Sequence, residues 1–327
     1  MSIRRATAAV LLACALVAGG CGGGDGEDQA TDPPRDARPD QFPSAKGKTL
    51  AQLRKELPEG GPVLAPSVSQ FTVGENRLGF GLFTTARAQI ADAQAVVYVA
   101  PVGGGEAQGP FVAHYESLAV KPQFHSKTTA VDPDAAKSVY VADVPFERPG
   151  RYELLGMALL DDRLVAATSA TPQITVVRKD IVPGPGDPAP RIHTPTETDV
   201  GGNLAEIDTR DPPSSQHEKD FADVVGQKPV VLTFATPLLC QSRVCGPVVD
   251  VVEQVKDEYG DRAEFIHMEI YRDNEVDKGF RPQVAAWKLP SEPWVFTIDK
   301  TGKVAARLEG AFSAEELEAA VKQALKG

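Results

Sequence analysis

Two cysteines, Cys240 and Cys245, stand in the stretch "FATPLLCQSRVCGPVV" with four residues between them. Paired thiols can form a disulfide, exchange with the thiols of another protein, or bind a soft metal ion. If both lay in one regular helix, their Cα atoms would be about 8.6 Å apart and rotated by about 140°, which is too far for a disulfide. The spacing therefore allows a disulfide only if Cys240 lies in a loop and Cys245 lies in the first turns of the following helix.

The N-terminal residues indicate the compartment in which these thiols work. Arg4 and Arg5 precede an apolar run over 6–18, which is shorter than the ~18 residues of a membrane-spanning helix. With the small residues before Cys21, residues 1–20 resemble the signal peptide of a bacterial lipoprotein. The resemblance implies cleavage before Cys21, lipidation of Cys21, and an extracytoplasmic protein anchored to the periplasmic side or outer face of the cell membrane. Two alternatives are a lipoprotein signal at Cys14, where "LLAC" fits the usual pattern better but leaves a very short apolar core, and an ordinary secretory signal peptide.

The charge of the chain narrows the classes of partner. The formal net charge is −11, and no basic block follows the leader. This argues against nucleic acid as a partner and against electrostatic binding to a membrane surface. The expected membrane contact is therefore the lipid on Cys21. Cys240 and Cys245 are then left to pair, and two cysteines in an exported chain are most simply a disulfide or a dithiol couple.

Composition divides the rest of the chain into segments. Residues 21–60 are rich in Gly, Asp and Pro, and predict a disordered tether that includes a short helix in "KTLAQLRKELPEG". Residues 61–178 consist of short runs that alternate apolar and polar positions, which predicts an all-β sandwich. A Pro/Gly linker is predicted at 179–189, and a second domain at 190–327.

The sandwich segment resembles immunoglobulin-like domains at one motif. In "RPGRYELLGMA", Tyr152 follows a Pro-Gly turn, as in the tyrosine corner of that family. His114 and His125 lack a second cluster of ligands in this segment, so surface histidines are predicted rather than a copper site.

Helical and strand patterns alternate in the second domain. Helices are predicted in "SSQHEKDFADVVG", from the cysteine segment to Tyr259, and in "RPQVAAWKL"; strands are predicted in "KPVVLTFA" and "AEFIHMEIY". The stretch "PWVFTIDKTGKVAARLEG" predicts a hairpin, and Ser313 with Glu316 predicts a capping box at the start of the last helix.

These segments resemble the thioredoxin-like superfamily, especially its exported TlpA and redoxin type. "PGPGDPAPRI" is similar to the entry segment of that group, "VVLTFATPLLC" to the strand that delivers the cysteine loop, and "CGPVVDVVEQV" to the active-site helix. "WKLPSEPWVFTIDKTGKV" is similar to the loop of the family's cis-proline, which would be Pro293. The resemblance implies an α/β thioredoxin-like fold, but Val248 stands where the family has its second cysteine.

The resemblance also implies a function. It implies a thiol–disulfide oxidoreductase for exported protein partners, in which Cys240 is the attacking thiol and Cys245 resolves the mixed disulfide. The positive end of the helix would stabilise a thiolate on Cys240. Glu292 and Pro293 would lie against a bound peptide, and the charge of Glu292 would raise the pKa of a nearby thiol. No cofactor and no metal ion is expected.

The same residues bear on three other functions. A non-catalytic thioredoxin-like scaffold would use the disulfide as a structural crosslink, so the sequence leaves enzymatic turnover open. The cysteine segment also resembles Sco-type copper proteins, but no histidine follows His267, for which a core position is predicted. A thiol peroxidase of the peroxiredoxin family would need Pro at 233 and Thr at 237, where this chain has Thr233 and Pro237.

Overall fold

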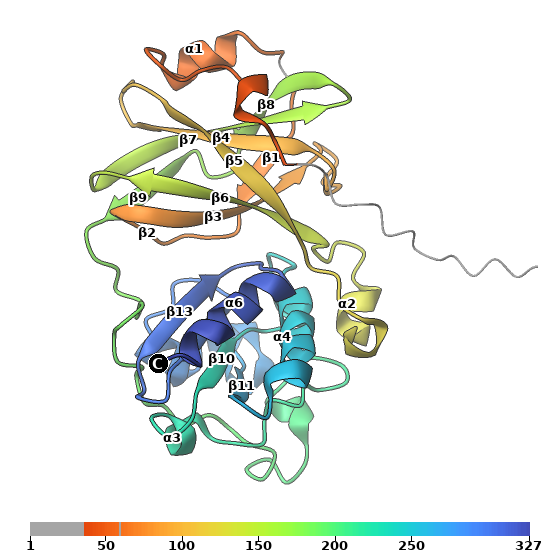
Figure 1. Cartoon of the computed structure of the whole chain (residues 1–327). Coiled ribbons are helices and arrows are strands. Elements are labelled where there is room, and N and C mark those ends of the chain that lie inside the picture. Colours follow the sequence, from red (N-terminus) through yellow and green to blue (C-terminus); the bar gives the residue numbers. More distant parts are fainter. Residues whose placement is uncertain (1–35, 59) are drawn as a thin grey trace, which may run out of the picture. The chain divides into compact units, whose positions relative to one another are not determined.

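The computed structural model describes residues 36–58 and 60–327 (Figure 1). The predicted signal peptide and Cys21 lie outside the described residues. The described residues all belong to one compact unit of the chain. No helix among them is long and apolar enough to cross a membrane.

The first half of the described chain forms a closed β-barrel (Figure 1). Seven strands follow one another in the order β7-β4-β5-β6-β3-β1-β8, and β8 pairs again with β7. The strands of this ring are β1 (Val63–Pro66), β3 (Gly74–Phe83), β4 (Gln94–Pro101), β5 (Gln108–Ser117), β6 (Ser138–Phe146), β7 (Gly150–Leu160) and β8 (Arg163–Ser169). The short strands β2 (Phe71–Thr72) and β9 (Gln173–Val177) extend the sheet beyond β7. Because β1 is parallel to β8 whereas the other neighbours in the ring are antiparallel, the barrel is mixed.

This ring overturns the predicted immunoglobulin-like sandwich, so the predicted fold class was wrong for this segment. A sandwich packs two separate sheets, whereas here Val63 pairs with Thr168, and β7 and β8 pair as well, so one sheet closes on itself. An alternating sequence pattern shows only that each strand has one buried face. Strands of a sandwich and of a barrel both bury one face, so the pattern does not distinguish the two architectures. The local motif still forms, because the Tyr152 hydroxyl donates a hydrogen bond of 2.9 Å to the Arg148 carbonyl.

Residues 36–58 pack on the outside of the barrel. The helix α1 (Leu50–Lys55) begins with a capping box formed by Thr49 and Gln52. Phe42 and Leu53 are buried with Tyr98 of β4, whose side chain points away from the interior because neighbouring residues on a strand face opposite sides. This part of the predicted tether therefore carries a helix and a buried apolar face.

The second half of the chain contains a four-stranded sheet in the order β11-β10-β12-β13. Its strands are β10 (Val230–Phe234), β11 (Glu264–Met268), β12 (Trp294–Ile298) and β13 (Val304–Glu309). β10 is parallel to β11, and β12 is antiparallel to β10 and β13. The helices α4 (Cys245–Tyr259) and α6 (Ala314–Ala324) pack on one face, where Val231 and Val295 meet Val248 and Leu317.

This small sheet with few helices also differs from the α/β thioredoxin fold that the sequence resemblance implied. The stretches predicted as helices around 214–226 and 281–289 hold only α3 (Phe221–Val224) and α5 (Pro282–Ala286). In this region polar side chains accept hydrogen bonds from backbone amides that would otherwise donate to carbonyls within a helix. Asp208, for example, accepts from the amides of Arg210 and Ser214. The rest of this part consists of turns and loops around the sheet.

Several local predictions for this half are confirmed. α4 begins at Cys245 and ends at Tyr259, and Ser313 and Glu316 form the capping box of α6. The hairpin between β12 and β13 turns at 299–303, where the Gly302 amide bonds to the Asp299 carbonyl. The remaining short helices are α2 (Lys127–Val131), η1 (Pro39–Gln41), η2 (Pro122–Phe124), η3 (Leu204–Glu206), η4 (Arg272–Asn274) and η5 (Val276–Lys278).

Candidate functional site

The two cysteines form a disulfide at the start of α4. Cys240 lies in the loop after β10, Cys245 is the first residue of the helix, and their Cα atoms are 5.9 Å apart. This is the arrangement that the spacing allows, with one cysteine in a loop and one in the first turn.

The two sulfur atoms have unequal surroundings. Cys240 is 6% exposed and lines a small surface pocket, whereas Cys245 is 0% exposed. The Cys240 sulfur lies 3.4 Å from the amide nitrogen of Cys245 and 3.2 Å from the Ser242 hydroxyl, so both groups can donate a hydrogen bond to it. Donors at the start of a helix favour negative charge, so a thiolate on Cys240 would be stabilised after reduction.

A segment between two barrel strands covers the cysteine loop. We call residues 118–137, which join β5 to β6, the strap. The pocket beside Cys240 is lined on the strap side by Thr128, Thr129, Asp132 and Ala135. Leu118 of the strap and Val139 of β6 pack in the same apolar cluster as both cysteines. The strap therefore borders the side of Cys240 that faces the pocket.

Polar contacts hold the strap in place. The amide and hydroxyl of Ser126 both bond to Asp250 of α4, whose other carboxylate oxygen lies 2.9 Å from Arg210 Nε. Nearer the cysteines, the Asp132 carboxylate pairs with Arg243 at 2.9 Å, and the Ala136 amide donates to the Arg243 carbonyl. Arg243 therefore links the cysteine loop to the strap, and it lines the pocket together with Cys240.

The predicted peptide-binding residues lie in another loop. The peptide bond between Glu292 and Pro293 is cis, as the resemblance implied. Pro293 is buried and accepts a hydrogen bond from the Gly310 amide, while burial raises the pKa of Glu292. The pocket beside Cys240 is lined by the strap and the cysteine segment rather than by Glu292 or Pro293. The predicted roles of these two residues stay predictions.

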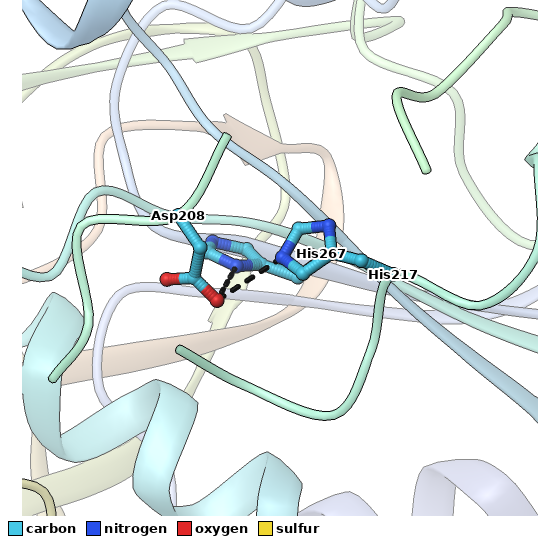
Figure 2. Close-up of side chains that lie close together, drawn as sticks. All are labelled: Asp208, His217 and His267. Atoms are coloured by element: carbon cyan, nitrogen blue, oxygen red, sulfur yellow. Dashed lines mark hydrogen bonds and ion pairs between the residues drawn. The ribbon is translucent and has the colours of Figure 1, made fainter. Parts of the chain in front are cut away.

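A cluster that the sequence did not single out lies in the core of this half. Figure 2 shows the imidazole rings of His217 and His267 turned toward one carboxylate oxygen of Asp208. The distances from Asp208 Oδ2 are 3.0 Å to His217 Nε2 and 3.3 Å to His267 Nδ1. The second nitrogen of His267 lies 3.0 Å from the Ala235 carbonyl oxygen, to which it donates.

The histidines and the aspartate of this cluster shift the pKa values of one another. Burial alone would lower the pKa of His267, but the Asp208 carboxylate, with help from Glu269 and the Ala235 carbonyl, raises it to about 9. Burial alone would raise the pKa of Asp208, but His267 and His217 hold it well below its usual value. The raised pKa of His267 and the lowered pKa of Asp208 make them a buried cation beside a buried anion at neutral pH.

The cluster also supports the loop that carries Cys240. His267 holds Ala235 at the start of that loop, and the hydroxyl of Thr209, next to Asp208, accepts from the Leu238 amide at 3.1 Å. Sequence reasoning placed His267 in the core but missed Asp208, and it assigned His217 to a helix. The available signal was a run of polar residues, "DTRDPPSSQHEKD", that is too polar for a buried segment unless its side chains meet partners.

The chain was compared with known proteins. No protein-family model matches it, and no curated protein matches it. Among solved structures it is similar to a thiol:disulfide interchange protein of the thioredoxin family from Chlorobium tepidum TLS. That similarity has 19% sequence identity and a TM-score of 0.29, and covers 45% of this chain and 99% of the other. A TM-score of 0.29 does not establish a shared fold, so the function is argued from the cysteine pair itself.

Proposed function

We propose that the chain is an extracytoplasmic thiol–disulfide exchange protein in which Cys240 is the reacting sulfur and Cys245 the resolving one. The unequal placement of the two sulfurs carries the proposal. Cys240 borders the surface pocket and has two hydrogen-bond donors, whereas Cys245 is fully buried. An incoming thiol can therefore approach only one end of the disulfide.

The exchange balances as two consecutive sulfur displacements. A partner thiolate attacks the sulfur of Cys240, a mixed disulfide forms, and Cys245 leaves as a thiolate that takes up a proton. A second partner thiol displaces Cys240, so the partner is oxidised by two electrons and this chain is reduced. In reverse, the Cys240 thiolate attacks a partner disulfide and Cys245 resolves the product.

Two cysteine variants test these roles. Cys245→Ser should trap mixed disulfides through Cys240 in an oxidising compartment, visible on non-reducing gels, because the resolving thiol is missing. Cys240→Ser should trap few or none, since the remaining thiol is buried. The double variant is the control for background bands. Equal trapping by both single variants would contradict the assigned roles, and no trapping by either would contradict the exchange function.

A structural crosslink is the second candidate, and the burial of the pair favours it. Both cysteines belong to an apolar cluster with Leu118, Val139 and Val249. A crosslink that stabilises this cluster should have a reduction potential below about −300 mV, whereas a working couple should lie well above it. Equilibration of the purified protein in glutathione buffers separates the two candidates.

The proposed location rests on the leader. Residues 1–20 would be removed and Cys21 lipidated, which would hold the chain at the outer side of the cell membrane within reach of exported partners. Cys21→Ser should move the protein from the membrane fraction to the soluble fraction. An unchanged membrane fraction would contradict the lipid anchor.

A further inference from the structure

Three buried side chains from two segments of the chain converge in its second half (Figure 2). Asp208 and His217 lie in the loop before α3, and His267 lies on β11. Their exposed fractions are 1%, 3% and 0%. We propose that Asp208, His217 and His267 bind one divalent transition-metal ion of the Zn²⁺ type.

The donor set fits this class of ion. Two imidazole nitrogens and one carboxylate oxygen are a frequent set of three protein ligands for Zn²⁺, with a fourth position left for water or another donor. Mg²⁺ and Ca²⁺ favour sites made of oxygens alone, and Cu(I) favours thiolates or thioethers. The cysteines are joined in the disulfide, so they offer no thiolate to such an ion.

The spacing of the donor atoms fits as well. With metal–ligand bonds of about 2.0–2.1 Å, neighbouring ligand atoms of a tetrahedral site are about 3.3 Å apart. Asp208 Oδ2 lies 3.0 Å from His217 Nε2 and 3.3 Å from His267 Nδ1. All three donor atoms lie within 4.8 Å of one another, so a small movement of the rings would complete the site.

Neighbouring groups hold two of the three donor residues, His267 and Asp208, in position, whereas Nδ1 of His217 is buried without a partner among the described residues. Nε2 of His267 donates to the Ala235 carbonyl oxygen, which directs Nδ1 toward Asp208. A backbone carbonyl on the second ring nitrogen is the usual support of a metal-binding histidine. The Asp208 carboxylate is fixed by the amides of Arg210 and Ser214 at 2.8 and 2.7 Å.

Several buried polar atoms in and around the cluster have no hydrogen-bond partner among the described residues. His267 Nδ1 is buried and makes no well-aligned hydrogen bond within residues 36–58 and 60–327, although it faces Asp208 at ion-pair distance. The hydroxyls of Ser214 and Thr233 are likewise buried without a partner among these residues. Unsatisfied buried polar groups are rare in folded proteins, and a bound ion with its water is one common explanation.

Asp208 and Glu269 are both buried, with exposed fractions of 1%. A divalent ion that replaced the proton of His267 would keep positive charge beside these two carboxylates. It would also join the loop that contains Asp208 and His217 to β11, whose His267 donates to Ala235 at the start of the loop that carries Cys240.

Metal uptake by the wild-type chain is the first test. Zn²⁺ and Co²⁺ are added separately to EDTA-treated full-length protein with the disulfide intact. One ion should bind per chain in calorimetry, and Zn²⁺ should raise the melting temperature. Side-chain ¹⁵N spectra should shift for His217 and His267 and stay unchanged for His114, His125 and His193, the other histidines of the chain.

A matched pair of variants locates the site. His217→Gln should weaken Zn²⁺ binding by at least about tenfold, since even groups that only support a ligand contribute that much. His193→Gln is the control, because His193 also pairs with an aspartate, Asp220 at 2.6 Å, but is 85% exposed. Its affinity for Zn²⁺ should match that of the wild type.

Three results would overturn the proposal. They are no stoichiometric uptake of either ion by the wild type, Zn²⁺-dependent shifts on the exposed histidines alone, and unchanged affinity in a folded His217→Gln variant. If His217→Gln fails to fold, the wild-type histidine spectra decide, because they need no substitution.

Discussion

The two halves of this chain bury different kinds of groups. The barrel interior is filled by apolar and aromatic side chains such as Phe80, Tyr140 and Phe146. Of the sixteen buried polar or charged side chains within the described residues, fourteen lie between Thr194 and Ser313. A buried charge costs free energy unless it is paired, so a region that keeps many of them does so for specificity or chemistry. The buried polar groups among the described residues are therefore concentrated in the half that also contains the cysteine pair.

The same pair of residue types occurs in both halves, which sharpens the comparison. His114 and Asp36 lie on the outside of the barrel, 2.9 Å apart, with more than half of each side chain exposed. His267 and Asp208 lie 3.3 Å apart, and both side chains are fully buried.

The largest expected effect comes from breaking the buried pair. Asp208→Asn should lower the free energy of unfolding by about 3–5 kcal/mol in EDTA-treated protein, because it removes the charged partner nearest to the buried His267. The measurement is urea unfolding. Asp36→Asn, the exposed counterpart, should cost less than about 1 kcal/mol. Equal costs would contradict the difference between the halves.

The next effect is on pH dependence. The pKa of His267 is raised to about 9, from 6.5 for an unperturbed histidine, so the folded state binds this proton more tightly than the unfolded state. Its contribution is full below about pH 6.5 and is lost as the pH rises toward 9. Stability should therefore fall by a few kcal/mol over this window without metal. His267→Gln should flatten that slope, and His114→Gln should leave it unchanged.

A hydrogen bond between uncharged groups on the barrel should contribute less to the free energy of unfolding than the buried ion pair does. The hydroxyl of Tyr98 donates to the Pro43 carbonyl oxygen at 2.7 Å and links the N-terminal segment to β4. Tyr98→Phe should cost about 1 kcal/mol in urea unfolding, because the ring stays packed and one neutral hydrogen bond is lost. A cost as large as that of Asp208→Asn would show that the barrel also depends on polar contacts.

Asp132→Asn should have the smallest effect on stability but a clear effect on the rate at which the disulfide is reduced. Asp132→Asn removes the charge that pairs with Arg243, and should cost below about 1 kcal/mol because the pair is partly exposed. It should also loosen the strap and speed reduction of the disulfide by a small thiol several-fold. Lys127→Gln, which alters an exposed strap residue paired with Asp211 rather than with the cysteine loop, is the control. An unchanged reduction rate would show that the strap does not limit access.

Local features of this chain could be read from the sequence because they depend on neighbouring residues. The capping box of Ser313 and Glu316, the start of α4 at Cys245 and the hydrogen bond of Tyr152 each involve residues within a few positions. The disulfide belongs with them, since the spacing of its cysteines required one in the loop and one in the helix.

The closed barrel and the Asp208 cluster were decided by the tertiary structure alone. The ring closes because Val63 pairs with Thr168, and the cluster forms because His267 is brought to a loop that contains Asp208 and His217. Neither contact leaves a periodic signal in the sequence. A strand alternates apolar and polar residues in the same way in a barrel and in a sandwich, and the sequence around a polar residue does not indicate which distant residue it will contact. The sequence by itself therefore determined the local elements and the cysteine pair, whereas the arrangement of the sheets and the partner of each buried charge depended on contacts between residues far apart in the chain.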